Sequence, residues 1–256
     1  MDLKLRNKVF LISGSSRGIG NGIARVLLEE GAKVVLTGRK EEDLMKAVHE
    51  SEQEYPRQVL HHCGDLWKGE VLQSLEDKVI SHWSEIHGVV ANVGGVRGVP
   101  DVAIDEDDWN WYLKYNFEIA VKFAQHFIPS LTESKGSIVF IGSIAGLEDV
   151  GAPIPYNVGK AAIEVYSKSL SRRLGKSGVR VNTVSPGNVI FEGGNWDLKR
   201  RANKEAIDQM IDEKVPLDAF GSPDDIGNIV AFLLSSKAKF ITGSSIVADG
   251  GQTIGF

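Results

Sequence analysis

The stretch Lys8-Val9-Phe10-Leu11-Ile12-Ser13-Gly14-Ser15-Ser16-Arg17-Gly18-Ile19-Gly20 decides the fold of this chain. Its first five residues form a short apolar run, typical of a strand buried on both faces of a sheet. After the glycines, Ile19, Ile23 and Leu27 repeat with helical spacing up to Gly31. A strand, a glycine-rich turn and a helix in succession predict a phosphate site, because glycines let the backbone approach a ligand and the helix N-terminus presents free N–H groups.

The same alternation continues along the chain. Further strands are expected at 33–37, 57–62, 87–91, 136–141, 179–184 and 245–248. Helices are expected at 41–54, 105–128 and 223–234, and also in the segments between the other strands. We expect Pro129 to end the 105–128 helix, residues 98–105 to form a loop, and residues 188–214 to be polar and irregular. Seven buried strands alternating with helices predict an α/β doubly wound parallel sheet, and residues 1–256 are interpreted as one domain.

Two arginines stand where a dinucleotide's adenosine ribose would bind. The second strand ends in Gly38-Arg39-Lys40, with glycine where an acid would favour NAD(H), and Arg17 lies in the glycine turn. Arginines at this place accept a 2′-phosphate, so the sequence favours NADP(H) over NAD(H). The alternative is that Arg39 and Lys40 are solvated and the cofactor is NAD(H).

Polar residues follow two more strands. Asp65-Leu66 follows the third strand, where Asp65 is placed either to bond an adenine amino group or to cap the next helix. Asn92-Val93-Gly94 follows the fourth, and Ser143 follows the fifth. The carboxyl ends of parallel strands meet along one edge, so these side chains can share one crevice.

Tyr156 and Lys160 open the next helical run, in which apolar residues recur at 162, 165, 166 and 170. Residues four apart lie on one face of a helix, so the ammonium can approach the phenol. A free phenol is only about a thousandth ionised at neutral pH, and a neighbouring cation lowers its pKa toward the range of general acid–base catalysis. The alternative is a packed ring beside a solvated lysine.

Composition excludes several classes of protein. The 256 residues are 42% hydrophobic and 25% charged, with a net charge of −5 and no basic block of the kind that binds nucleic acid. Cys63 is the only cysteine and the six histidines are scattered, so no metal site is expected. No apolar run is long enough to span a membrane, and no signal-peptide core is present near Met1, so the expected location is the cytoplasm.

In their order along the chain, these motifs resemble the short-chain dehydrogenase/reductase family in its compact single-domain Rossmann form. The resemblance runs from Lys8 to Gly251, and it also includes Asn116, Pro186-Gly187 and Asp249-Gly250-Gly251. Similar general patterns occur in 3-oxoacyl-acyl-carrier-protein reductases and in sugar or polyol dehydrogenases. The resemblance implies an NADP(H)-dependent oxidoreductase acting on a small carbonyl or secondary alcohol.

The resemblance also implies roles for individual residues. Tyr156 would be the general acid or base, Lys160 would lower its pKa and hold the nicotinamide ribose, Ser143 would bond the substrate oxygen, and Asn116 would hold a water that replaces the spent proton. The cofactor-binding positions it implies are Gly14, Ser16, Arg17, Gly18, Ile19, Gly20, Arg39, Asp65, Leu66, Asn92, Gly94, Tyr156, Lys160, Pro186, Gly187 and Val189. One departure is that Asn188-Val189 stands where the family often has a threonine that touches the cofactor amide.

The substrate pocket is expected from residues 94–97, 147–154 and a lid at 188–214. Arg97 and the run Lys199-Arg200-Arg201 are candidates to meet an anionic substrate, and Glu148 and Glu192 to bind hydroxyls, the alternative being solvated charged loops. The family also implies a homotetramer built through the helices of Asn116 and Tyr156 and through the C-terminal strand. Two further functional alternatives are an NAD(H)-dependent sugar or polyol dehydrogenase and a non-catalytic cofactor sensor on the same fold.

Overall fold

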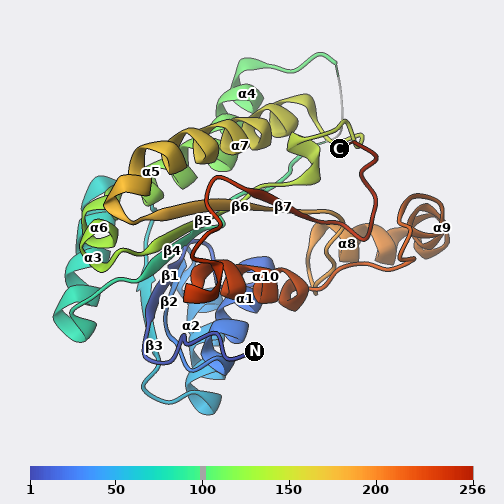
Figure 1. The fold of residues 1–256 in the computed structure, drawn as a ribbon. Coiled ribbons are helices and arrows are strands. Elements are labelled where there is room, and N and C mark those ends of the chain that lie inside the picture. The colour runs from blue at the N-terminus through green and yellow to red at the C-terminus, as the bar shows by residue number, and fades with distance from the viewer. Residues whose placement is uncertain (99–101, 256) are drawn as a thin grey trace.

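The computed structural model describes residues 1–98 and 102–255 and confirms the doubly wound parallel sheet (Figure 1). Within these ranges, seven strands pair in the order β3-β2-β1-β4-β5-β6-β7, all in parallel. The strands are β1 (Val9–Ile12), β2 (Lys33–Gly38), β3 (Val59–Cys63), β4 (Gly88–Ala91), β5 (Ser137–Ile141), β6 (Arg180–Pro186) and β7 (Ser245–Ala248). The order changes direction between β1 and β4, which is where ligands bind in open sheets of this kind.

Helices cover both faces of the sheet. The helices are α1 (Gly18–Glu29), α2 (Glu41–Glu54), α3 (Gly69–Trp83), α4 (Glu106–Leu113), α5 (Ile119–His126), α6 (Ile128–Ser134), α7 (Ile154–Leu174), α8 (Asn195–Ala202), α9 (Lys204–Lys214) and α10 (Pro223–Leu234). Figure 1 shows α4, α5 and α7 on one side of the sheet and α1 and α10 on the other. Each face therefore has its own apolar core.

The first strand shows how its sequence serves both cores. Phe10 and Ile12 pack with α1 and α10, whereas Val9 and Leu11 pack with α3, α5 and α7. All four side chains are buried. A continuous apolar run is what a strand needs when both of its faces are covered, so the interpretation of residues 8–12 is confirmed.

The helix expected over residues 105–128 has a different form. One π-helical turn, Lys114–Glu118, interrupts it, and the buried Asn116 lies within that turn. Pro129 does not end the helix, which stops at His126, but lies in the first turn of α6. Proline is tolerated in a first turn because its missing N–H has no partner there in any case.

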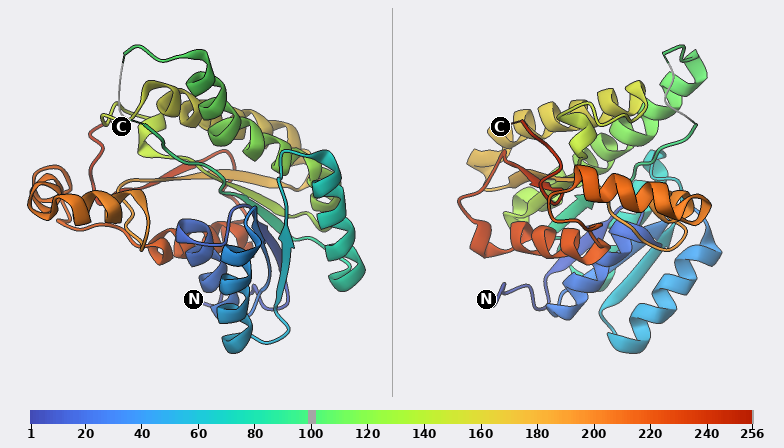
Figure 2. Two further views of the ribbon diagram at one scale, coloured as in Figure 1. Left: turned by 180° about the vertical axis from the view of Figure 1, so that it is seen from behind. Right: turned by 90° about the vertical axis from the view of Figure 1, so that its right-hand side faces the viewer.

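The helical run opened by Tyr156 and Lys160 is confirmed as α7, and of its apolar residues Leu170 is buried and Tyr166 packs against the core, whereas Val165 is 68% exposed. The expectation for residues 188–214 was wrong in part. Residues 188–214 are not irregular throughout, because they contain α8 and α9, which extend to one side of the sheet (Figure 2). Only one residue of these two helices, Ile211, is buried, so they lack the apolar stripe by which a helix is recognised in a sequence.

The loop expected at 98–105 includes residues 99–101, which lie outside the described residues, as does Phe256. In the described part of the chain, no helix combines the length and apolar character needed to cross a bilayer.

Candidate active site

A cleft of about 590 Å³ opens at the carboxyl edge of the sheet. It is lined by the glycine turn after β1, by the residues that follow β2 to β6, and by the first part of α8. Most of the sequence-predicted site residues line it: Gly14, Ser16, Arg17, Gly18, Ile19, Arg39, Asp65, Leu66, Asn92, Gly94, Ser143, Tyr156, Lys160, Pro186, Gly187 and Val189. The other two, Gly20 and Asn116, lie directly behind this lining, as described below.

The glycine turn needs its glycines for two different reasons. Gly14 and Gly18 have φ angles of +65° and +60°, a region that side chains with a Cβ rarely adopt. Gly20 is required by close packing, since a Cβ there would lie 2.6 Å from Nδ2 of Asn92. The turn therefore brings the N-terminus of α1, with its free N–H groups, to the floor of the cleft.

Asn92 connects the glycine turn to β4. Its side-chain nitrogen donates to the carbonyl oxygens of Ser13 and Gly14 at 3.0 and 2.9 Å, and its backbone N–H donates to the Ser13 hydroxyl at 2.8 Å. Ser13 is completely buried, so this hydroxyl has a structural role. These bonds fix the turn relative to the neighbouring strand, on the two sides of the change in strand order.

Arg17 and Arg39 both line the cleft. Arg17 occupies the position just before α1, in extended backbone conformation. Arg39 reaches across to Tyr115, where Nη1 donates to the phenol oxygen at 2.7 Å and the guanidinium carbon lies 4.9 Å from the ring centre. One interaction of Arg39 was thus not anticipated from the sequence.

Asp65 is not the cap of the following helix. Its carboxylate accepts the backbone N–H of Trp67 at 3.1 Å, and the residue before α3 is Lys68. A turn closed by the Lys68 N–H on the Asp65 carbonyl separates the two. Of the two interpretations of Asp65, only the position in the cleft beside Leu66 remains.

Lys160 is enclosed next to the end of β5. Its Nζ donates to the carbonyl oxygen of Ile141 at 2.9 Å and lies 5.9 Å from the ring centre of Tyr156. Burial lowers the pKa of Lys160 to about 8, with Glu164 opposing the change. The lysine is therefore much closer to losing its proton at neutral pH than an exposed lysine is.

The pKa of Tyr156 differs from the expectation. Burial raises it above its ordinary value, the hydrogen-bonding Ser143 hydroxyl opposes this, and Tyr112 adds to it. In this structure the phenol thus holds its proton firmly, as a general acid must before it acts.

Asn116 lies behind Gly94, turned inward by the π-helical turn. Its oxygen accepts the Gly95 N–H at 2.9 Å, and its nitrogen donates to the carbonyl oxygens of Gly95 and Tyr112 at 3.0 and 3.2 Å. A Cβ on Gly94 would lie 3.0 Å from the Asn116 oxygen and 3.1 Å from Nζ of Lys160. The absence of a side chain at Gly94 therefore lets Asn116 and Lys160 come together.

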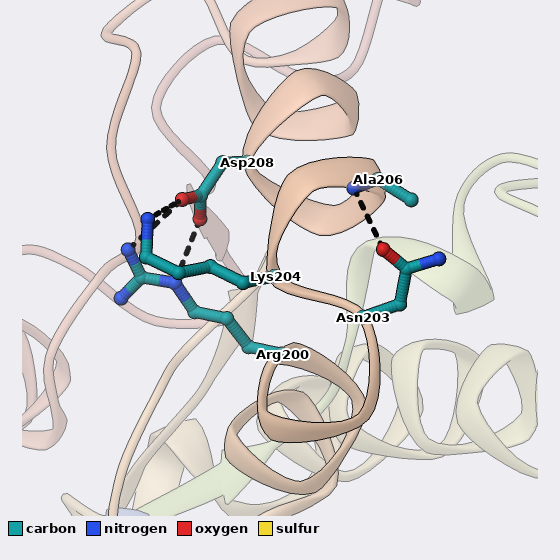
Figure 3. A network of polar contacts seen from close by, with 5 residues as sticks. All are labelled: Arg200, Asn203, Lys204, Ala206 and Asp208. Atoms are coloured by element: carbon teal, nitrogen blue, oxygen red, sulfur yellow. Dashed lines mark hydrogen bonds and ion pairs between the residues drawn. The ribbon is translucent and has the colours of Figure 1, made fainter.

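The basic residues considered for an anionic substrate do not line the cleft, and the three arginines among them have acidic partners within the chain. Arg97 pairs with Asp108 and stacks on Trp111 at 4.5 Å. Arg201 pairs with Asp197 at 2.9 Å, and Lys199 lies over the Trp196 ring. Figure 3 shows Arg200 and Lys204 converging on Asp208, at 2.7 and 2.6 Å.

The two glutamates considered for substrate hydroxyls also lie outside the lining of the cleft. Glu148 accepts the backbone N–H groups of Ile254, at 3.0 Å, and of Gly255. It therefore holds the C-terminal segment against the loop after β5. Glu192 is exposed.

Three further lining residues, Val96, Phe191 and Trp196, fall within the ranges 94–97 and 188–214 expected for the pocket and lid, whereas Tyr115 was missed from the sequence. Tyr115 reaches the cleft only because the π-helical turn shifts the helix register, which sequence periodicity does not reveal. Within the expected lid segment, the aromatic residues Phe191 and Trp196 stand out from an otherwise polar stretch, and these two line the cleft. Among residues 1–98 and 102–255, no group of three or more His, Cys, Asp or Glu side chains could hold a metal ion.

Comparison with known proteins gives consistent results. A family model described as enoyl-(acyl carrier protein) reductase matches residues 14–253. The chain is 31% identical to a 3-oxoacyl-acyl-carrier-protein reductase, FabG, of Staphylococcus epidermidis, over 96% of this chain and 99% of that protein. It is also 31% identical to dehydrogenase/reductase SDR family member 4 of Rattus norvegicus, over 96% and 88%.

Among solved structures, L-sorbose reductase from Gluconobacter frateurii, complexed with NADPH and L-sorbose, superposes with a TM-score of 0.92 at 28% identity, covering 100% of both chains. The family match covers nearly the whole chain, and the relatives and the structural neighbour align with it over most of their own length. The chain therefore belongs to the short-chain dehydrogenase/reductase family of oxidoreductases.

Proposed function

We propose that this protein transfers a hydride between NADP(H) and a carbonyl/secondary alcohol pair, with Tyr156 as the general acid or base. The observation that carries the proposal is the meeting of Ser143, Tyr156 and Lys160 in one cleft with the glycine turn. The bound nicotinamide would supply the hydride. The chain's own residues would orient the reactants and move the proton.

The cleft residues fit a dinucleotide. The backbone at Gly14 and Gly18 adopts positive φ, and a Cβ at Gly20 would collide with Asn92, so the turn is built for close backbone approach to phosphate. The volume of the cleft, about 590 Å³, lies in the ordinary range of cofactor sites. Asp65 and Leu66 stand where adenine would bind, and Pro186, Gly187 and Val189 stand near the nicotinamide end.

The proton would follow a short route through this chain's side chains. In the direction of reduction, the Tyr156 hydroxyl would donate its proton to the substrate oxygen while the Ser143 hydroxyl bonds the same oxygen and stabilises the charge developing there. Lys160 would stabilise the resulting phenolate. Asn116 would hold the water that returns the proton. It lies near Lys160, because a Cβ built on Gly94 would lie 3.0 Å from the Asn116 oxygen and 3.1 Å from Nζ of Lys160.

The preference for NADP(H) rests on Arg17 and Arg39, which line the same cleft. A guanidinium binds a phosphate in a bidentate manner, and Gly38 leaves no acid to bind a free 2′-hydroxyl. The bound NADPH of the L-sorbose reductase supports this choice. If the alternative of an NAD(H)-dependent enzyme held, replacing both arginines by alanine would leave the affinity for the preferred cofactor unchanged.

The substrate itself is proposed to carry no net charge. Among residues 1–98 and 102–255, the charged side chains that line the cleft are Arg17, Arg39, Asp65 and Lys160, and all four are assigned above to the cofactor or to proton transfer. The part of the cleft proposed to bind the substrate is lined by glycine backbone, Phe191 and Trp196. A panel of neutral and carboxylate-bearing ketones of equal length tests this, with the neutral ones expected to have the higher kcat/KM.

Residues 1–256 are proposed to act as one domain with 188–214 as its lid, to assemble as a homotetramer through α4, α5, α7 and β7, and to work in the cytoplasm. The one seven-stranded sheet that the described residues form supports the single domain. The exposed apolar side chains of Val158 and Val165 on α7 support the homotetramer.

The Tyr156→Phe variant tests the proposed role directly. It removes the transferable proton but keeps the ring, so turnover should fall by at least about a hundredfold while NADPH affinity changes little. Retained turnover would remove Tyr156 from the mechanism. If neither the wild type nor the Tyr156→Phe variant turned over any member of a broad carbonyl and alcohol panel while NADPH bound tightly, the non-catalytic sensor would be favoured.

A further inference from the structure

The guanidinium of Arg39 is bound by Tyr115, and both residues line the cleft. We propose that Tyr115 is a positioning residue that orients Arg39 toward a 2′-phosphate and thereby sets the preference for NADP(H). This inference rests on the proposed function. It adds a residue whose contact with Arg39 only the structure reveals.

The contact joins two elements that are distant in sequence. Arg39 follows β2, and Tyr115 lies in the π-helical turn between α4 and α5. Nη1 of Arg39 donates to the phenol oxygen at 2.7 Å, and the guanidinium carbon lies 4.9 Å from the ring centre. Both residues line the cleft. Tyr115 thus fixes the far end of a long side chain at the place where the adenosine ribose would lie.

The geometry leaves the arginine able to bind a phosphate. A guanidinium carries five N–H donors, and the bond to Tyr115 uses Nη1, so Nε and Nη2 keep donors for a second ligand. An exposed arginine must lose rotamer freedom when it binds a phosphate. Tyr115 would impose part of that order beforehand, which favours binding through preorganisation.

Tyr115 is itself held in place. Its ring packs on Trp111 with centroids 4.8 Å apart, and Lys114 lies 5.9 Å from its centre. Trp111 stacks in turn on Arg97, which pairs with Asp108. The ring therefore belongs to a row of packed planar groups along α4, which gives it one orientation in which to meet Arg39.

The same π-helical turn presents Asn116 to the catalytic side and Tyr115 to the arginine. In a regular α-helix, adjacent residues point about 100° apart, and the extra residue of a π turn changes which of them reaches the cleft. The turn thus serves both ends of the cleft. A variant that removes only the Tyr115 hydroxyl leaves this backbone feature intact.

The inference is tested by measuring dissociation constants for NADPH and NADH by fluorescence titration at one fixed ionic strength. The proteins compared are the wild type, Tyr115→Phe, Arg39→Ala and the double variant. Tyr115→Phe should weaken NADPH binding by about fivefold to tenfold, because the freed Arg39 side chain must then be ordered when the cofactor binds, and should change NADH binding by less than about twofold. In the Arg39→Ala background, the same substitution should have no further effect on NADPH. Tyr55→Phe is a matched control, because its hydroxyl bonds Glu54 on the surface at 2.9 Å.

Each other outcome has a definite meaning. Unchanged NADPH affinity in Tyr115→Phe would overturn the positioning role, and tighter NADPH binding would show that Tyr115 competes with the phosphate for Arg39. Equal weakening of NADPH and NADH would show a general effect on the cleft and would also overturn it. If Arg39→Ala leaves the NADPH-to-NADH preference unchanged, the proposed arginine site itself fails, whereas a failure confined to Tyr115→Phe leaves that site standing.

Discussion

At the scale of single residues, Lys160 carries an electrostatic cost, because its ammonium is buried in the site. Its side chain is 4% exposed, and burial lowers its pKa from 10.5 to about 8. That difference corresponds to on the order of 3 kcal/mol of unfavourable free energy when the buried lysine is charged. The protein keeps this cost at the place where a cation next to Tyr156 is useful.

The cost predicts a pH-dependent stability difference between wild type and Lys160→Met. Between about pH 8 and pH 10.5 the unfolded chain binds the proton and the folded chain releases it, so wild-type stability rises with pH relative to the variant. Below about pH 8 the full cost is present, and above pH 10.5 it is absent. Denaturant unfolding at pH 7 and pH 9.5 measures this, and a stability difference that does not change with pH would contradict the buried cation.

Single residues also show what a sequence can predict about a site. Tyr156, Lys160, Ser143 and Asn92 were predictable because fixed spacing and strand ends placed them along one edge. The expected lowering of the Tyr156 pKa was not met, because burial of the phenol raises that pKa, and the depth at which a side chain is buried is not visible in a local sequence pattern. The contact between Arg39 and a residue 76 positions away was not predictable from local patterns.

At the scale of elements, α1 and α10 cross at very close range. A Cβ on Gly22 would lie 2.7 Å from the carbonyl carbon of Pro223, and a Cβ on Gly227 would lie 3.0 Å from the Gly22 carbonyl oxygen. Arg25 of α1 also pairs with Asp224 at the start of α10. The glycines let α10 dock on the helix that carries the phosphate-binding turn.

Gly22→Ala should therefore destabilise the fold. The added methyl group meets backbone atoms, which cannot rotate away, so overpacking should cost about 1–3 kcal/mol. For a chain of this size that lowers Tm by about 3 °C per kcal/mol. Gly69→Ala, where a Cβ would meet nothing within 4 Å, is the matched control and should be neutral or slightly stabilising. Equal Tm values for the two variants would contradict the close crossing.

The α8–α9 pair is held by charge more than by a core. Arg200 and Lys204 both bond Asp208 (Figure 3), and these contacts lower the pKa of that carboxyl to about 2, so the carboxylate stays ionised at ordinary pH. Asp208→Asn should speed amide hydrogen exchange across residues 195–214 and leave the sheet unchanged. The exposed Asp212→Asn on the same helix is the control, and equal exchange in the two variants would contradict the network's role.

The elements themselves were predictable to differing degrees. Apolar runs and helical periods placed the seven strands, α2 and α10 closely, because these segments serve a core that leaves a pattern in the sequence. The pair α8–α9 and the π-helical turn left no such pattern. The first is stabilised by ion pairs, and the second is a change of register within a continuous helix.

At the scale of the whole molecule, the proposed tetramer depends on surfaces left open on α7. Val165 is 68% exposed and Val158 is 43% exposed on this helix. Val165→Glu should shift the protein to smaller species in size-exclusion chromatography with light scattering, because it places a charge in an apolar interface. Met45→Glu on α2, on the other side of the molecule, should not. A monomeric wild type would refute the assembly.

The arrangement of the described chain brings the residues proposed for phosphate binding, for proton transfer and for the lid to one edge of one sheet. The central claim is that this edge binds NADP(H) and reduces an uncharged carbonyl compound. The most direct test measures turnover with NADPH and with NADH across a panel of sugars, neutral ketones and 3-oxoacyl thioesters. The account predicts turnover of at least one neutral carbonyl with NADPH strongly preferred. Turnover with NADH preferred, or only with anionic substrates, would contradict it.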